Sequence, residues 1–80
     1  MAALSDLQQR IIRMAADQAA GQFRLSPDGG PVAVGSTSFP ADDVAEAVNG
    51  LVDEDLLMKV GKGLFELTGD GWIRATKIVL

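Results

Sequence analysis

The stretch LVDEDLLMKVGKGLFELTGDG, residues 51–71 of this 80-residue chain, decides the fold. It opens with the end of an apolar-faced helix and continues into two short apolar runs, residues 56–60 and 64–67. Between the runs lies Gly-Lys-Gly at residues 61–63, which suits the tight turn of a β-hairpin. Thr68 then offers a side-chain oxygen that can cap a last helix. The stretch therefore predicts a helix, a β-hairpin and another helix in direct succession.

The junction between helix and hairpin has a signal of its own. Asp55 stands where the chain must leave the helix, and aspartate is among the residues that tolerate the left-handed backbone conformation. Leu56 and Leu57 follow directly, and one side chain of the pair is expected to face the core. We therefore expect Asp55 to end the helix and Leu56 to begin the first strand.

In order and spacing, this half of the chain resembles a known family. The residues that carry the resemblance are Leu51, Asp55, Leu56, Leu57, Leu67, Thr68 and Gly71. They are similar to the end of the second helix-turn-helix helix and the wing in winged-helix domains of bacterial regulators of the MarR-like kind. The resemblance implies a DNA-binding regulator and leaves open a homodimer, since that family often dimerises through terminal helices. We expect an α+β fold, a small winged helix that forms a single domain over residues 1–80.

Upstream of the decisive stretch, residues 40–54 have the pattern of an amphipathic helix. Its apolar residues keep the spacing of one helix face: Val44, Ala47, Val48, Leu51 and Val52. Pro40 suits the first helical turn, and Asp42 and Asp43 fall near the positive end of the helix dipole. Gly50 weakens a helix by about 1 kcal/mol relative to alanine, but the apolar face continues beyond it. We therefore expect one helix rather than a shorter one that ends before this glycine.

The N-terminal part predicts a further helix, over residues 5–20. Ser5 and Gln8 have the spacing of a capping box, and Gly21 suits the end of the helix. Its buried stripe at helical spacing would consist of Leu7, Ile11, Met14 and Ala15.

Residues 21–40, between the two expected helices, are irregular in pattern. Residues 26–31, Ser-Pro-Asp-Gly-Gly-Pro, are dense in turn-forming types. Apolar residues alternate with others on both sides of this turn, at Phe23, Leu25, Val32 and Val34. This pattern predicts either a loose hairpin or one strand plus a surface loop. The short helix that precedes the recognition helix in the resembled family is not evident here.

The C-terminal helix would hold Trp72, Ile73 and Thr76 on one side. An aromatic residue at helical spacing usually fills a core, so we expect Trp72 to pack the last helix on the first; a binding hot spot is the alternative. The apolar end of the chain consists of Ile78, Val79 and Leu80. This segment would either complete the core or pair with a second copy of the chain.

The net charge of −4 is concentrated in one segment, because residues 41–55 carry six acidic side chains and no basic one. On the open face of the expected recognition helix lie Asp42, Asp43, Glu46, Asp53 and Glu54. DNA carries about one negative charge per 1.7 Å of its axis and would be repelled by such a face. We therefore expect a non-enzymatic protein-interaction module, an adaptor or modulator, whose acidic helix face binds a protein partner of basic character. A solvated helix face without a partner is the plainer interpretation.

The alternative function is a DNA-binding transcriptional regulator. Lys59 and Lys62 on the expected wing could contact phosphates, and Arg10 and Arg13 of the first helix could extend that patch. Arg74 and Lys77 could do the same if the last helix lies nearby, whereas Asn49 is the one residue of the acidic helix suited to base readout. A plainer role for the lysines is to discourage edge-to-edge aggregation of the hairpin.

Several functional classes fit the sequence poorly. It contains no cysteine, histidine or tyrosine, so the usual nucleophile–base pairs of enzymes are absent. Asp53-Glu54-Asp55 lacks the alternation of a calcium loop, and the glycine pairs at 61–63 and 69–71 lack phosphate-loop spacing. No run approaches the ~18 apolar residues of a membrane span, and the N-terminus has no signal-peptide pattern. We expect no cofactor, no metal, no membrane insertion and a cytoplasmic location.

Overall fold

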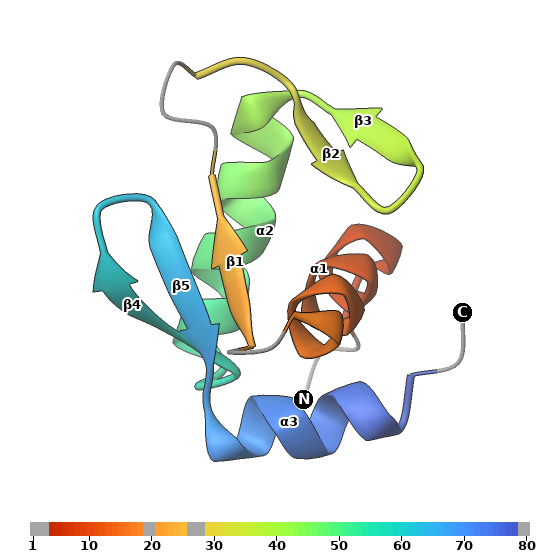
Figure 1. Cartoon of the computed structure of the whole chain (residues 1–80), viewed down its shortest axis with the longest axis vertical. Coiled ribbons are helices and arrows are strands. Elements are labelled where there is room, and N and C mark those ends of the chain that lie inside the picture. The colour runs from red at the N-terminus through yellow and green to blue at the C-terminus, as the bar shows by residue number, and fades with distance from the viewer. Residues whose placement is uncertain (1–3, 19–20, 26–28, 79–80) are drawn as a thin grey trace.

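Three helices and two antiparallel sheets form an α+β fold in the computed structural model, which describes residues 4–18, 21–25 and 29–78 (Figure 1). The helices are α1 (Asp6–Asp17), α2 (Ala41–Asp53) and α3 (Gly69–Thr76). Figure 1 shows α1 beside the larger sheet, α2 behind it, and α3 running beneath both. The expected α+β class and the three expected helices are therefore present.

The larger sheet joins the hairpin to a strand from the N-terminal half of the chain. Its strands are β1 (Gln22–Arg24), β4 (Leu57–Gly61) and β5 (Leu64–Leu67), in the order β1-β5-β4. The hairpin β4–β5 was predicted, with β4 beginning one residue later than expected and including Gly61. Gly63 takes φ +68°, which only glycine adopts readily, and thereby closes the turn.

The segment between α1 and α2 differs from both alternatives suggested by its pattern. The strand that contains Phe23 pairs with β5 and does not pair with the strand that contains Val32. Instead, β2 (Val32–Val34) pairs with β3 (Thr37–Phe39) in a separate hairpin. The Gly35 N–H donates to Met14 Sδ at 3.4 Å, which joins the turn of this hairpin to α1. The alternating pattern located β1 and β2, but it did not predict β3 and carried no information about which strands pair.

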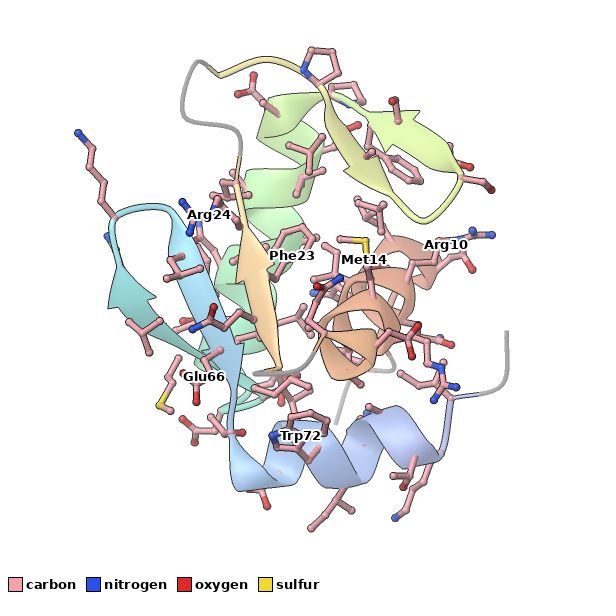
Figure 2. The ribbon with its side chains drawn as sticks, in the orientation of Figure 1. Arg10, Met14, Phe23, Arg24, Glu66 and Trp72 are labelled. Atoms are coloured by element: carbon pink, nitrogen blue, oxygen red, sulfur yellow. The ribbon has the colours of Figure 1, made fainter. Side chains whose placement is uncertain are left out.

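The core lies between the helices and the inner face of the larger sheet. Its largest fully buried side chains are Phe23, Ile11, Ile12, Leu51, Leu57, Val34, Val44 and Val48. Figure 2 shows Phe23 pointing from β1 toward α1, while Arg24, the next residue, lies on the other side of the strand. The α2 stripe is confirmed for four of its members, and Val52 is half-buried. In α1 the buried residues are Ile11, Ile12 and Ala15, so the expected stripe omitted Ile12.

Some helix ends differ from the sequence-based boundaries. Helix α1 ends at Asp17 because Gln18 is already extended, at φ −83° and ψ 146°; residues 19–20 of the expected helix lie outside the described part. Pro40 is the N-cap of α2 rather than part of its first turn. Gly50 lies inside α2, so the expectation of one continuous helix is confirmed.

Helix α2 ends in the way that its sequence predicts. Asp55 takes φ +60°, the Leu56 N–H donates to the Leu51 carbonyl at 2.9 Å, and the chain turns into β4. Leu56 and Leu57 are both buried, at 5% and 2% exposure, although only one was expected to face the core. Leu57 lies in the sheet, whereas Leu56 precedes β4. The Leu56 carbonyl accepts from the N–H of Thr68, the N-cap of α3, at 3.2 Å, so this residue lies at the start of α3.

Helix α3 buries a different face from the expected one. Thr68 caps it as predicted, with its Oγ1 accepting from the Gly71 N–H at 3.0 Å. The buried residues are Gly71 and Ala75, whereas Trp72 and Ile73 are 39% and 57% exposed. The prediction that Trp72 fills the core is therefore wrong. The small residues let α3 lie close to the body of the molecule, and the large ones remain outside.

The structure places Trp72 and, of the apolar segment at residues 78–80, only Ile78. Trp72 lies against Gly21, which follows α1 (Figure 2). Ile78 is half-buried and packs against the core, whereas Val79 and Leu80 lie outside the described residues. Within the described chain, Ile78 therefore contributes to the core.

The left-handed residue at the end of α2 gives a direct prediction. Asp55→Gly should raise the free energy of unfolding by about 0.5–1 kcal/mol, because glycine has no Cβ to crowd this conformation. The substitution also removes a negative charge from the negative end of the helix dipole. Urea denaturation followed by circular dichroism measures the change. Asp53→Gly, inside the helix, is the control and should destabilise; stabilisation by both variants would contradict the explanation.

Candidate functional site

An open groove of about 720 Å³ lies between the start of α1 and one face of α2. The α2 wall is a single stripe, because its residues recur at helical spacing: Asp43, Glu46, Ala47, Asn49, Gly50 and Asp53. Ser5, Leu7 and Gln8 of α1 form the opposite wall, and Phe39 at the end of β3 closes one end. The groove therefore combines residues from three separate parts of the chain.

The floor of the groove is apolar and its rim is acidic. Leu7 and Phe39 are half-buried and pack against the core, and Ala47 is 8% exposed. The carboxylates of α2 that line the groove belong to exposed residues. Among the described residues that line it, none is basic. The groove can thus offer both a surface for an apolar group and negative charge around it.

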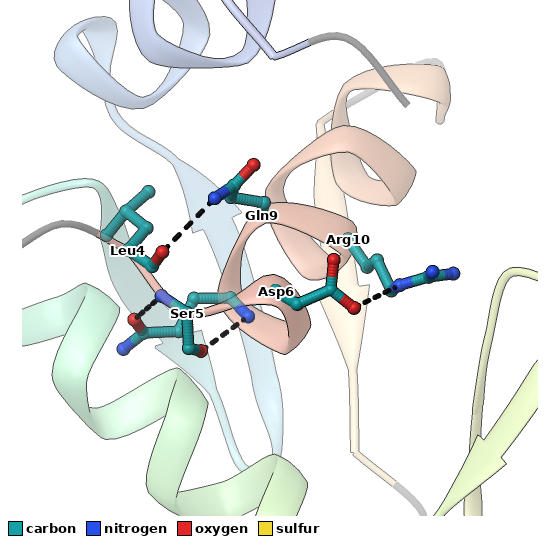
Figure 3. Close-up of polar contacts among 6 residues, drawn as sticks. Leu4, Ser5, Asp6, Gln9 and Arg10 are labelled. Atoms are coloured by element: carbon teal, nitrogen blue, oxygen red, sulfur yellow. Dashed lines mark hydrogen bonds and ion pairs between the residues drawn. The ribbon is translucent and has the colours of Figure 1, made fainter.

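The α1 wall is held in place by hydrogen bonds at the start of the helix. The capping box is present as predicted: Gln8 N–H donates to Ser5 Oγ at 3.1 Å, and Ser5 N–H donates to Gln8 Oε1 at 2.9 Å (Figure 3). Gln9 Nε2 also donates to the Leu4 carbonyl at 3.1 Å. Together these bonds fix the backbone and the Gln8 side chain that face the groove.

Gln8 also connects this wall to α2. Its Nε2 donates to the Ala47 carbonyl at 3.3 Å, and a Cβ added at Gly50 would lie only 2.6 Å from the same nitrogen. The glycine is thus the place where the Gln8 amide approaches the α2 backbone. In the sequence, Gly50 could be recognised only as a residue of low helix propensity. Its contact with Gln8 could not be foreseen from local spacing, because the two residues are far apart in the chain.

This close approach predicts a coupling between Gly50 and Gln8. Gly50→Ala should leave stability nearly unchanged, because the helix-propensity gain of about 1 kcal/mol is offset by displacement of the Gln8 amide. In a Gln8→Ala background the same substitution should stabilise by about 1 kcal/mol. A double-mutant cycle from urea denaturation measures the difference. Equal effects in the two backgrounds would show that the residues are not coupled.

The structure divides the five acidic residues predicted to bind a protein partner. Asp43, Glu46 and Asp53 line the groove, whereas Asp42 does not. Glu54 lies instead near α3, in a shallow pocket of about 260 Å³. Asn49, considered for base readout, lines the acidic groove.

The candidate DNA-binding residues fall into separate groups. Arg10 and Arg13 belong to α1, on the opposite side of the molecule from the β4–β5 turn that carries Lys62 (Figure 1). Arg10 Nε is also within 2.8 Å of Asp6 Oδ2, an exposed pair that contributes little stability. Arg74 and Lys77 line the pocket beside α3 together with two acidic residues, Glu54 and Asp70. The structure therefore does not bring the predicted basic patch together.

Arg24 is a basic residue that the sequence analysis missed. It is exposed on β1 and pairs in register with Leu64, at the end of the sheet where the Lys62 turn lies (Figure 2). With Lys62 of the turn it forms the basic wing end. Lys59 is in register with the buried Phe65 and therefore lies on the opposite face of the sheet from Arg24. The signal could not be found in sequence because it depends on β1 pairing with β5.

The described residues form neither a cluster of metal-binding side chains nor a long apolar helix. No three carboxylates among them converge in a way that would hold a metal ion. None of the described helices is long and apolar enough to cross a membrane. Comparison with known proteins returned no matching family model, no matching curated protein and no matching solved structure.

Proposed function

We propose that this protein is a non-enzymatic interaction module that binds a basic segment of a partner protein along the groove between α1 and α2. The observation that carries the proposal is the alignment of Asp43, Glu46 and Asp53 along one wall of an open groove, with no basic residue among the described lining. Opposite charge across an interface favours encounter and suppresses wrong partners.

The arrangement of elements supports a winged-helix layout as the scaffold for this role. Apart from the β2–β3 hairpin inserted after β1, the order is α1, β1, α2, β4, β5 and α3, with β1 pairing with β5 beside the β4–β5 hairpin. In this proposal α2 takes the place of the recognition helix and β4–β5 that of the wing. The β2–β3 hairpin then stands where the family has its short second helix. An acidic α2 makes this a winged helix suited to protein rather than to DNA.

A pair of charge reversals on α2 tests the proposal. Glu46→Lys and Asp42→Lys change the net charge equally, and both residues are exposed, but only Glu46 lines the groove. Binding of a fluorescein-labelled octalysine peptide, measured by anisotropy at moderate salt, should weaken about fivefold or more for Glu46→Lys and about twofold or less for Asp42→Lys. Equal weakening by both variants would mean that general charge, not the groove, holds the peptide. Lack of binding at low salt would overturn the proposal.

The basic wing end supports DNA binding as a second candidate function. Arg24 and Lys62 are exposed near one end of the sheet, away from the acidic groove. Two phosphate contacts would give a slope of log K against log salt of about −2. Anisotropy of a labelled mixed-sequence duplex at several salt concentrations measures that slope. Lys62→Glu should then abolish DNA binding and leave octalysine binding unchanged; a duplex that does not bind at low salt excludes this candidate.

A further inference from the structure

We propose that the groove recognises a Lys/Arg-rich peptide segment that carries an apolar side chain between its basic residues, with that side chain seated on Leu7, Phe39 and Ala47. This inference rests on the proposed function and specifies the chemistry of its partner. Acidic residues alone would accept any cation. The apolar floor beneath them is what makes the groove selective.

The floor is suited to an aliphatic or aromatic side chain. Leu7 comes from α1, Phe39 from β3 and Ala47 from α2, so the surface is assembled from three elements that pack on one core. Leu7 and Phe39 remain half-exposed within the groove. An apolar side chain placed over them would remove this apolar surface from water, which favours binding.

The carboxylates of Asp43, Glu46 and Asp53 determine the charge of the peptide that can bind and the length of the segment that they can contact. Asp43 and Asp53 are ten positions apart on α2, which corresponds to about 15 Å along a helix axis, with Glu46 between them. A row of this length matches an extended segment of about five residues. Lysine or arginine side chains of such a segment would form charge-assisted hydrogen bonds with the carboxylates.

Hydrogen bonds within the chain itself hold the two walls of the groove in place. The capping box fixes the start of α1, and the Gln8 Nε2 bond to the Ala47 carbonyl holds α1 against α2. A preformed groove avoids most of the ordering cost of binding. Short segments should therefore bind measurably, although weakly.

The test is an NMR titration of the ¹⁵N-labelled full chain with two synthetic peptides. One peptide has a central leucine between two pairs of lysines, and the other has alanine in place of the leucine. We expect the leucine peptide to bind about fivefold tighter or more, from the extra apolar area buried. The largest amide shifts should fall on Leu7, Gln8, Asn49 and Gly50. Glu46→Lys should weaken both peptides, and Asp42→Lys should weaken neither by more than about twofold.

The outcomes separate this inference from the proposed function. Equal affinities for the two peptides, with loss in Glu46→Lys, would overturn the apolar selectivity and leave the proposed function in place. A leucine preference with shifts confined to α3 or the β4–β5 hairpin would also overturn the inference, because the apolar contact would then lie elsewhere. If neither peptide binds, both the inference and the proposed function are overturned. Circular dichroism of the two exposed-site variants confirms that each remains folded.

Discussion

Gly71→Ala is expected to lower the free energy of unfolding by about 3 kcal/mol, since the added methyl group has no room. An ideal Cβ at this position would overlap the Leu56 carbonyl oxygen and touch Leu67 Cδ2 at 3.0 Å. The carbonyl cannot easily move away, because it accepts the Thr68 N–H and belongs to the turn that ends α2. Backbone on both sides of the contact must therefore shift, and α3 would separate from the hairpin.

Gly69→Ala is the matched control for this prediction. Gly69 begins the same helix, and a Cβ there would meet nothing within 4 Å. Its stability should therefore stay within about 0.5 kcal/mol of the original. Urea denaturation, followed by circular dichroism and by the fluorescence of Trp72, measures both variants. Similar stabilities for the two would mean that α3 is not held as closely to Leu56 as the structure has it.

Phe23→Ala is the second substitution with a large expected effect, a loss of about 3–5 kcal/mol. Phe23 is 1% exposed and pairs in register with Phe65, so its ring joins β1, β5 and the helices in one core. A domain of this size has a total stability of roughly 4–12 kcal/mol. The variant should therefore be partly or wholly unfolded at room temperature.

Arg24→Ala is the control, because Arg24 is exposed on the same short strand. It should stay within about 0.5 kcal/mol of the original stability. The comparison separates the effect of losing the buried Phe23 ring from the general effect of placing alanine in β1. A loss below about 1 kcal/mol for Phe23→Ala would contradict the placement of β1 in the core.

Signals within a few residues of one another predicted much of the fold. The structure confirms three such signals: the capping box of Ser5 and Gln8, the cap of α3 by Thr68, whose side chain accepts from the Gly71 N–H, and the left-handed Asp55. All three depend on local backbone geometry. The apolar stripe of α2 and the β4–β5 hairpin likewise follow from short-range periodicity. These features could be predicted because each depends on residues that are close together in the sequence.

The features that were missed depend on contacts between distant parts of the chain. The partner of β1 lies beyond three intervening strands and α2, and no local pattern specifies it. Trp72 was expected in the core because it is an aromatic residue at helical spacing, whereas the close approach of α3 requires the small Gly71 on the buried face. The acidic rim was visible in sequence, but its division into groove and non-groove residues depends on where α1 crosses α2.

The pairing of β1 with β5 has a consequence for the order in which the molecule folds. During synthesis β1 emerges early, whereas its partner strand lies in the last quarter of the chain. Phe23 therefore lacks the strand that it pairs with until residues 64–67 have left the ribosome, and the β4–β5 hairpin, whose contacts are local, forms before β1 joins it. The larger sheet is thus completed last, and a nascent chain that stops before β5 retains an exposed aromatic strand that is prone to aggregate.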